Sequence, residues 1–326
     1  MTSQNIPQTL LRVAPICLGT GGFGSSVADA EGVLEAYAEM GGDFIDTAHN
    51  YGDWIADGPR SASEKAIGAW MRANGNRDSL VLATKGGHPK FDAPDVGRLS
   101  RKDVMEDLDG SLETLGTDRI DLYWLHKDEP SRPVGEIVET LNEAVKDGRV
   151  RYLGASNFAV ERIRDANAHA HQNGLAGFVA DQVLWSAAPL QGYPYGDPGV
   201  GFVDPVRWEF HRETGMAMIP FQSQAFGLFN RMDNGTLDAM NKGFRGFYRA
   251  EESAARYGRM REIMDETGLT ITQVVLGYLL GQPFPTFPII GSQSVAQVRD
   301  SMAALDVRLT AEQIDRIDGG RKGSIL

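Results

Sequence analysis

The feature that most constrains the fold of this chain is a regular alternation of short apolar runs with longer amphipathic segments. Eight apolar runs follow one another, at residues 15–19, 43–48, 79–85, 120–126, 151–156, 178–185, 216–222 and 287–291. Near-continuous apolar strands that alternate with helices are typical of a parallel sheet covered on both faces. Eight such units within 326 residues favour a closed (β/α)8 TIM barrel, an α/β fold, over an open sheet.

Helical spacing of apolar residues predicts the intervening segments. These helices are expected at residues 32–40, 63–71, 104–115, 136–145, 160–170, 205–213, 271–280 and 295–305. An N-terminal β-hairpin is expected at 9–14, and the tail from 310 predicts an extra capped C-terminal helix followed by a mobile end. No linker-like composition break divides the chain, so we expect one domain over residues 1–326.

One long segment does not fit the repeat. Residues 227–251 follow the seventh strand and are too many for a simple turn into a helix. Long loops inside compact domains are often functional lids, and a plain insertion is the alternative.

Composition excludes several classes of partner. A formal net charge of −12 and a pI near 5.0 argue against a nucleic-acid-binding protein. No run approaches the roughly 20 apolar residues of a membrane helix, and the N-terminus does not resemble a signal peptide. The single cysteine, Cys17, cannot form an internal disulfide and fits a reducing compartment, so we expect a soluble cytoplasmic protein. We interpret Cys17 as a small buried hydrophobe, with a reactive thiol as the alternative.

Two motifs suggest other functions. GTGGFG at Gly19–Gly24 matches the dinucleotide-binding pattern of an open doubly wound sheet, but the pattern is weak in a chain with 38 glycines. His169 and His171 form an H-x-H pair of the kind found in metal-dependent barrel hydrolases. The pair falls in the last turn of a predicted helix and not at a strand end, so we expect exposed histidines and no metal site.

Four polar residues stand at or just beyond the ends of neighbouring apolar runs. Asp46 and Tyr51 lie in FIDTAHNYG, Lys85 in VLATKGG and His126 in IDLYWLHKD. Barrel strands bring their carboxyl ends to one mouth, where these side chains can form a proton-donating site for a carbonyl. A free tyrosine has a pKa of about 10, and a neighbouring ammonium is expected to lower it. Each residue alone has a structural explanation, whereas four at one barrel mouth favour a site.

These residues resemble the active site of the aldo-keto reductases in order and spacing. The resemblance covers nearly the whole chain. It includes the Ser63–Glu64 pair, GASNF at 154–158, DQVLWS at 181–186, FQSQAFG at 221–227 and IIGSQSVAQVRDS at 289–301. It implies NAD(P)(H)-dependent interconversion of a small-molecule carbonyl and an alcohol. Tyr51 is then the general acid in reduction and the base in oxidation, with Lys85 and Asp46 tuning it and His126 orienting the carbonyl.

The same resemblance implies the cofactor-binding residues. Ser156, Asn157 and Gln182 are expected to hold the nicotinamide carboxamide, and the aromatic face of Phe221 to stack on the ring. Thr20 is expected to touch the ribose, while Ser223, Gln224 and the loop after Gly227 enclose the pyrophosphate, which favours the lid interpretation of 227–251. The remaining predicted cofactor residues are Asp46, Gly291, Ser292, Gln293, Gln297, Asp300 and Ser301.

Two departures from the family pattern bear on specificity. NADPH-specific members carry basic residues after the last strand, whereas here only Arg299 is basic within 291–301. Our hypothesis is that the chain uses both cofactors or favours NAD, and the alternative is a preference for NADP. An insertion at 53–62 brings Trp54 toward the site. Polar groups beside aromatic faces suit a sugar or sugar-derived aldehyde, although Trp54 and Trp185 can equally be packing residues. The predicted substrate-binding residues are Asn50, Trp54, His88, Lys127 and Trp185.

Two rival functions remain open. Some proteins on this scaffold are cofactor-binding regulatory subunits with little or no turnover, and the intact set Asp46, Tyr51, Lys85 and His126 argues against that alternative. A metal-dependent barrel hydrolase is the other, and the sequence shows no ligand set for it.

Overall fold

The computed structural model describes residues 3–25, 27–55 and 58–320, and its centre is an eight-stranded parallel sheet. In sheet order, the strands are β10 (Ile289–Ile290), β3 (Cys17–Gly19), β4 (Phe44–Asp46), β5 (Val81–Gly86), β6 (Ile120–Leu125), β7 (Val150–Ser156), β8 (Phe178–Gln182) and β9 (Ala217–Met218). The two ends of the sheet join, because the amide of Phe287 donates to the carbonyl of Met218 (2.8 Å) and that of Ile289 to Pro220 (2.9 Å). The predicted barrel is therefore confirmed, and the open-sheet alternative suggested by Gly19–Gly24 is wrong.

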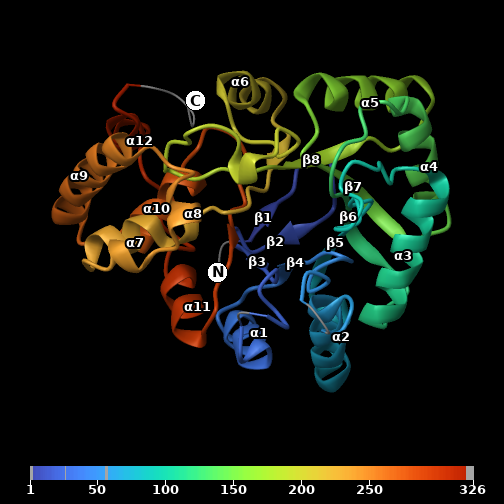
Figure 1. Cartoon of the computed structure of the whole chain (residues 1–326), viewed down its shortest axis with the longest axis horizontal. Helices are drawn as coiled ribbons and strands as arrows, with labels where there is room; N and C mark the ends of the chain where they lie inside the picture. The colour runs from blue at the N-terminus through green and yellow to red at the C-terminus, as the bar shows by residue number, and fades with distance from the viewer. Residues whose placement is uncertain (1–2, 26, 56–57, 321–326) are drawn as a thin grey trace.

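Helices surround the strands as the repeat predicts (Figure 1). They are α1 (Ala30–Glu39), α2 (Ala62–Asn74), α3 (Arg101–Leu115), α4 (Val134–Lys146), α5 (Val160–Gln172), α6 (Pro205–Thr214), α10 (Ile271–Leu280) and α11 (Val295–Met302). Side-chain oxygens fix several helix starts: Ser100, Asp204 and Ser294 each accept from the amide three residues on. None of the described helices is long and apolar enough to cross a membrane.

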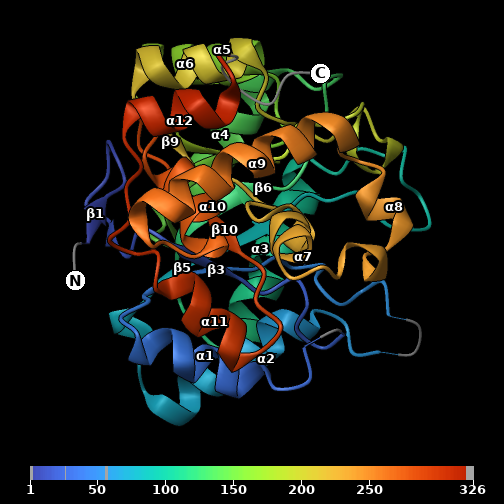
Figure 2. The same ribbon diagram turned by 90° about the vertical axis from the view of Figure 1, so that its left-hand side faces the viewer.

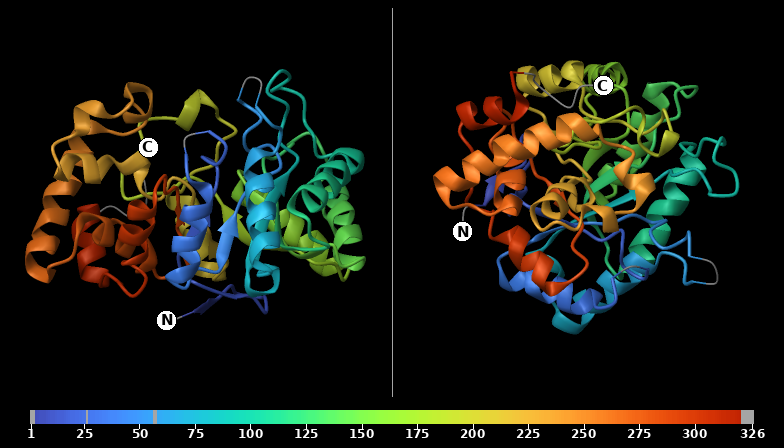
Figure 3. Two further views of the ribbon diagram at one scale, coloured as in Figure 1. Left: turned by 90° about the horizontal axis from the view of Figure 1, so that it is seen from below. Right: turned by 60° about the vertical axis from the view of Figure 1, so that its left-hand side comes forward.

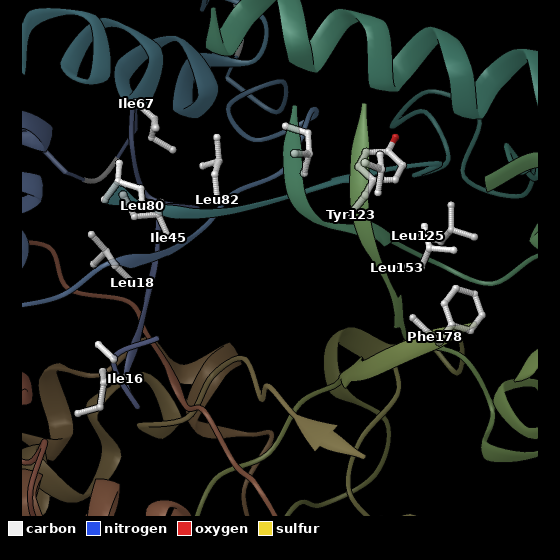
Figure 4. Close-up of a cluster of buried hydrophobic side chains, with 14 of the residues drawn as sticks. Ile16, Leu18, Ile45, Ile67, Leu80, Leu82, Tyr123, Leu125, Leu153 and Phe178 are labelled. Atoms are coloured by element: carbon white, nitrogen blue, oxygen red, sulfur yellow. The ribbon is translucent and has the colours of Figure 1, made fainter. Parts of the chain in front are cut away.

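The two-residue period of the strands divides the core into two layers. One parity faces the helices and forms the outer layer; it includes Leu18, Ile45, Leu82, Tyr123, Leu125, Leu153 and Phe178 (Figure 4). The other parity fills the barrel with Cys17, Phe44, Ala83, Leu122, Trp124, Ala217 and Ile289. Ala180 also faces inward, because an irregularity in the pairing of β7 with β8 interrupts the two-residue period between Phe178 and Ala180. Cys17 is fully buried, and burial raises the pKa of its thiol, so its interpretation as a small hydrophobe is confirmed.

The N-terminal hairpin closes the amino end of the barrel. Its strands are β1 (Gln4–Asn5) and β2 (Arg12–Val13), so it begins earlier than the predicted segment 9–14. The first strand is short and polar, and sequence periodicity does not mark it. Ile6, Leu11 and Val13 pack into the inner core, and the hairpin lies beneath the strands in Figure 3 (left).

The segment after β9 contains a helix that its sequence pattern does not reveal. Two 3₁₀ turns, η3 (Ala225–Gly227) and η4 (Leu237–Ala239), and the short helices α7 (Leu228–Asp233) and α8 (Lys242–Arg245) precede α9 (Ala250–Thr267). Helix α9 lies across α10, next to the predicted C-terminal helix α12 (Ala311–Asp318), in Figure 2. Its buried face includes Ser253 and Arg256, and this polarity weakens the apolar period. Arg256 pairs with Asp318 at 3.1 Å.

Candidate active site

Strand parity explains why three of the four predicted catalytic residues meet. Asp46, Lys85 and His126 each lie two residues beyond a member of the inner core, namely Phe44, Ala83 and Trp124. They therefore point inward at the carboxyl ends of β4, β5 and β6. On β7, position 154 requires glycine, because the indole of Trp124 occupies the space that a Cβ would need.

Lys85 is the centre of the cluster. Its Nζ donates to Asp46 Oδ2 at 2.5 Å, to the carbonyl of Thr47 at 2.7 Å and to the hydroxyl of Tyr51 at 3.2 Å. Both members of the Lys85–Asp46 pair are almost fully buried, which strengthens their interaction. The pair holds an ammonium group against the phenol oxygen.

The pKa of Tyr51 differs from the sequence-based expectation. Burial raises the pKa of this phenol, and the opposing effect of Lys85 is smaller, so the pKa lies above its ordinary value. The expected lowering is therefore wrong for this structure, because sequence does not show how deeply the ring is buried. Tyr51 keeps its proton at neutral pH.

His126 lies across the site from Tyr51, with ring centroids 5.8 Å apart. Burial lowers the pKa of His126 well below its usual range, and His88 and Lys85 add to the effect. The ring is therefore neutral at pH 7. Its Nδ1 is buried without a hydrogen-bond partner. We therefore place the proton of the neutral ring on Nε2, because a proton on Nδ1 would be a buried donor without an acceptor.

Five aromatic side chains form a closed circuit at the mouth. Tyr51 contacts Trp54 (5.9 Å), Trp54 contacts Phe91 (6.2 Å), Phe91 contacts His88 (5.4 Å), and His88 contacts His126 (4.8 Å). Trp54 and Phe91 are 46% and 51% exposed, which leaves their faces open to a ligand. Sequence reasoning placed Trp54 and His88 here but missed Phe91. The sequence signal that could have identified Phe91 is its aromatic side chain in the loop after β5.

Two predicted substrate residues have other surroundings. Trp185 is fully buried in a second core and stacks on Phe284 with centroids 5.9 Å apart, so its placement at the substrate is corrected. Lys127 is half-buried and pairs with Asp197 at 2.6 Å, which occupies its ammonium group. Asn50 lines a cavity of about 490 Å³ that reaches Lys85 and His88.

The predicted nicotinamide residues lie at the ends of β7, β8 and β9. Gln182 donates to Asp46 Oδ1 at 3.0 Å, which links the two predicted sites. Asn157 donates to the carbonyl of His126 at 2.9 Å and to Ser156 Oγ at 3.1 Å. Ser156 therefore keeps its own hydroxyl proton to donate. Phe221 is half-buried beside the inner core.

Thr20 and Ser223 are held by the protein itself. Thr20 is fully buried, and its Oγ1 accepts from Ser63 at 2.7 Å and lies 3.0 Å from the carbonyl of Asp46. The hydroxyl ties the end of β3 to α2, and the ribose contact of Thr20 stays a prediction. Ser223 donates to the carbonyl of Ile289 at 2.5 Å, which joins the loop after β9 to β10.

The remaining predicted cofactor residues lie on α11, in the segment just before it, and at Gln224 in the loop after β9. Gln224 donates to Ser301 Oγ at 3.2 Å, Gln297 Oε1 accepts from the amide of Gln293 at 2.7 Å, and Asp300 accepts from Thr272 at 2.5 Å. Gly291 is exposed, with open space where a Cβ would lie. Ser292 is buried, and its Oγ has no hydrogen-bond partner. A buried, unsatisfied hydroxyl beside a helix start fits a phosphate-bearing cofactor.

The histidine pair does not lie at the site. His169 and His171 are in the last turn of α5, as predicted, and His169 contacts Glu139 at 3.0 Å. Across residues 3–25, 27–55 and 58–320, no three His, Cys, Asp or Glu side chains gather as a metal site would need.

Comparison with known proteins agrees with this fold. A model of the Aldo/keto reductase family matches residues 15–321, so this chain belongs to that family. A thermostable aldo-keto reductase, Tm1743, solved with the inhibitor epalrestat, has the same fold: the TM-score is 0.72 at 22% identity, over 98% of this chain and all of that one.

Several curated relatives carry oxidoreductase names. Norsolorinic acid reductase B of Dothistroma septosporum is 28% identical, over 97% of this chain and 80% of its own length. Aryl-alcohol dehydrogenase GME11368 of Pestalotiopsis microspora is 29% identical, over 96% and 80%. The uncharacterized oxidoreductase YrpG of Bacillus subtilis is 31% identical, over 94% and 91%. Family and relatives together support an oxidoreductase.

Proposed function

We propose that this chain is an NAD(P)(H)-dependent oxidoreductase that interconverts a carbonyl and an alcohol, with Tyr51 as general acid or base. The observation that carries the proposal is the contact of Lys85 Nζ with both Asp46 and the Tyr51 hydroxyl. A carbonyl oxygen between Tyr51 and His126 receives a hydrogen bond from each ring. An absorbance assay of NAD(P)H with a panel of aldehydes, ketones and sugars tests the proposal, and no turnover with any of them would contradict it.

The residues divide the proton chemistry between them. In reduction, Tyr51 donates its hydroxyl proton to the carbonyl oxygen, and the Lys85 ammonium stabilises the phenolate that forms. Asp46 keeps Lys85 charged and aimed. His126, neutral because its pKa is depressed, donates from Nε2 and orients the carbonyl. In oxidation the phenolate of Tyr51 accepts the proton of the alcohol.

The cofactor would lie along the carboxyl ends of β7 to β10. When bound, NAD(P)H supplies the hydride. Ser156 and Gln182 would hold the carboxamide and Phe221 the ring face, while Ser292 Oγ offers the unsatisfied hydroxyl for a phosphate oxygen. The trio Ser156, Asn157 and Gln182 is already ordered by its contacts with Asp46 and His126.

The pH dependence of turnover should reflect the pKa of Tyr51 and not that of a histidine. Because its pKa is raised above about 10, Tyr51 remains protonated, and kcat/KM for reduction should be flat between about pH 7 and 9. Over the same range, oxidation should accelerate as phenolate forms. His126 is already neutral, so no inflection is expected at about pH 6.5. Steady-state profiles in both directions check this, and a reduction limb near pH 6.5 would contradict it.

Cofactor choice is expected to be relaxed. The segment 291–301 carries one basic residue, the exposed Arg299, so a 2′-phosphate gains little charge-assisted hydrogen bonding. NADPH should therefore bind less than about tenfold more tightly than NADH, a difference below about 1.4 kcal/mol. Titration of both reduced cofactors by fluorescence measures the ratio. A ratio of hundreds in favour of NADPH would show that another cation reaches the phosphate.

A further inference from the structure

The trio proposed to hold the nicotinamide carboxamide, Ser156, Asn157 and Gln182, is supported from the helix side of the sheet. The trio lies at the ends of β7 and β8, and the amide of Asn157 donates to the carbonyl of Gln182 at 3.2 Å, so the two strand ends are joined. The residues that border the trio, Phe158 and Asp181, are fully buried. Both of them accept a hydrogen bond from the same side chain of α6.

This side chain is Arg207, which lies in the first turn of α6 and is almost fully buried. Its Nη2 donates to the carbonyl of Phe158 at 2.5 Å, and its Nη1 donates to Asp181 Oδ2. The start of the helix is itself fixed, because Asp204 Oδ1 accepts from the backbone amide of Arg207 at 2.7 Å. A rigid, planar guanidinium holds two acceptors at a set separation. Arg207 therefore ties the segment after β7 to the end of β8.

The carboxylate of Asp181 is charged and is held against α6. Burial works to raise the pKa of this carboxyl, but Arg207 and His211 outweigh it and hold the pKa below its ordinary value. His211, also on α6, places its Nε2 3.1 Å from Asp181 Oδ2. Successive side chains of a strand point to opposite faces, so Asp181 faces the helices while Gln182 faces the barrel and donates to Asp46. A shift of Asp181 would therefore move Gln182.

Asn157 has a backbone conformation that needs support. Its φ is +61°, in the left-handed region, which is uncommon for a residue other than glycine and persists where the surrounding contacts impose it. Its Nδ2 donates to the carbonyl of His126 at 2.9 Å, and its Oδ1 accepts from the amide of Gly201 at 3.0 Å. The bond from Arg207 to the carbonyl of Phe158 fixes the residue that follows, so the bend at Asn157 is held on its C-terminal side as well.

We infer that Arg207 is a positioning residue for the cofactor, because its bridge between Phe158 and Asp181 keeps Asn157 and Gln182 at the spacing that the nicotinamide carboxamide requires. The inference rests on the proposed function, which assigns the carboxamide to this trio. Arg207 acts from the helix side of the sheet and through its neighbours. Loss of the bridge should weaken binding of the nicotinamide end of the cofactor, while the predicted contacts on α11 belong to another element and should persist.

The test compares NADH with ADP-ribose, which lacks the nicotinamide ring but is otherwise part of the same molecule. Calorimetric titration gives a dissociation constant for each. In Arg207→Lys, the NADH constant should rise at least about tenfold relative to that of ADP-ribose, the effect of about one lost hydrogen bond. A lysine has one terminal nitrogen and cannot keep both acceptors in place. A purely structural role would lower the midpoint of unfolding and leave the ratio unchanged, so an unchanged ratio in folded Arg207→Lys would overturn the inference.

The matched control is Arg77→Lys, because Arg77 makes a similar bridge at the amino end of the barrel. Arg77 lies in the 3₁₀ turn η1 (Arg77–Ser79), and its Nη2 donates to Asp121 Oδ2 at 2.8 Å and to the carbonyl of Arg119 at 2.8 Å. The control should lose stability but leave the ratio of the two dissociation constants unchanged. An equal change of the ratio in Arg77→Lys would indicate a general loosening of the barrel and would overturn the inference.

A second variant decides the question if Arg207→Lys does not fold. Asp181→Asn keeps the shape of the side chain but removes the charge that strengthens its bond with Arg207, so the NADH constant should rise at least about threefold relative to that of ADP-ribose. No change in this variant would then overturn the inference.

Binding measurements also separate this inference from the proposed function, because they need no turnover. A wild type that binds NADH but reduces no carbonyl overturns the proposed function, and the ratio in the variants still decides the role of Arg207. A wild type that reduces carbonyls, with an unchanged ratio in the variants, overturns the positioning role alone.

Discussion

Replacing Tyr51 with phenylalanine should lower kcat by about 10³-fold, within the range of roughly 10² to 10⁴ that a positioned acid or base contributes. The ring would still pack against Trp54 and His126, since the contacts that hold it are aromatic. Only the proton and its acceptor oxygen are lost. Single-turnover and steady-state measurements of NAD(P)H oxidation give the effect.

The Tyr51→Phe variant also separates an enzyme from a cofactor-binding regulatory subunit. Cofactor affinity, followed by fluorescence, should stay within about twofold, because no predicted cofactor contact involves the hydroxyl and a change below about 0.4 kcal/mol is expected. Tyr193→Phe is the matched control, since its ring is 55% exposed and packs on Phe202. Full activity in Tyr51→Phe would remove Tyr51 from the mechanism.

Breaking the Asp46–Lys85 pair should have the largest effect on stability. Asp46→Ala and Lys85→Met each leave one buried charge without its partner, and either change should cost about 3–5 kcal/mol of unfolding free energy. The double variant removes both charges and should cost clearly less than the sum. Denaturant unfolding measures all three, and turnover should be lost in each.

An exposed ion pair supplies the control for that comparison. Arg101 and Glu143 pair at 2.6 Å with side chains 66% and 45% exposed, so Glu143→Ala should change the free energy of unfolding very little. If Asp46→Ala cost no more than Glu143→Ala, the buried pair would have little role in folding. If the double variant cost the full sum, Asp46 and Lys85 would not be coupled.

Strand periodicity made much of the fold and the catalytic cluster predictable. The two-residue period that buries Phe44 and Ala83 also aims Asp46 and Lys85 inward, so strand limits were enough to bring them together. The same reasoning failed at Trp185 because β8 ends at Gln182. Beyond that point the chain leaves the barrel, and its direction depends on contacts with distant loops.

Other features depend on distances that sequence does not contain. The pKa of Tyr51 reflects a balance between burial and the charge of Lys85, and only the packed structure shows that burial is larger. The surroundings of His49 could not be predicted, because Gly110 and Glu64, which lie against its ring, belong to α3 and α2. Helix α9 was missed because its buried face includes the polar Arg256, which pairs with Asp318 at the far end of the chain.

The hairpin beneath the barrel determines from which end of the barrel substrate and product can reach the site. Ile6, Leu11 and Val13 seal the floor, and packed side chains fill the interior above them. The site is therefore closed toward the amino end of the barrel, and the exposed rings of Trp54 and Phe91 lie at the opposite, carboxyl end of the strands. Substrate and product are therefore expected to reach and leave Tyr51 from the carboxyl end of the barrel and not through its floor.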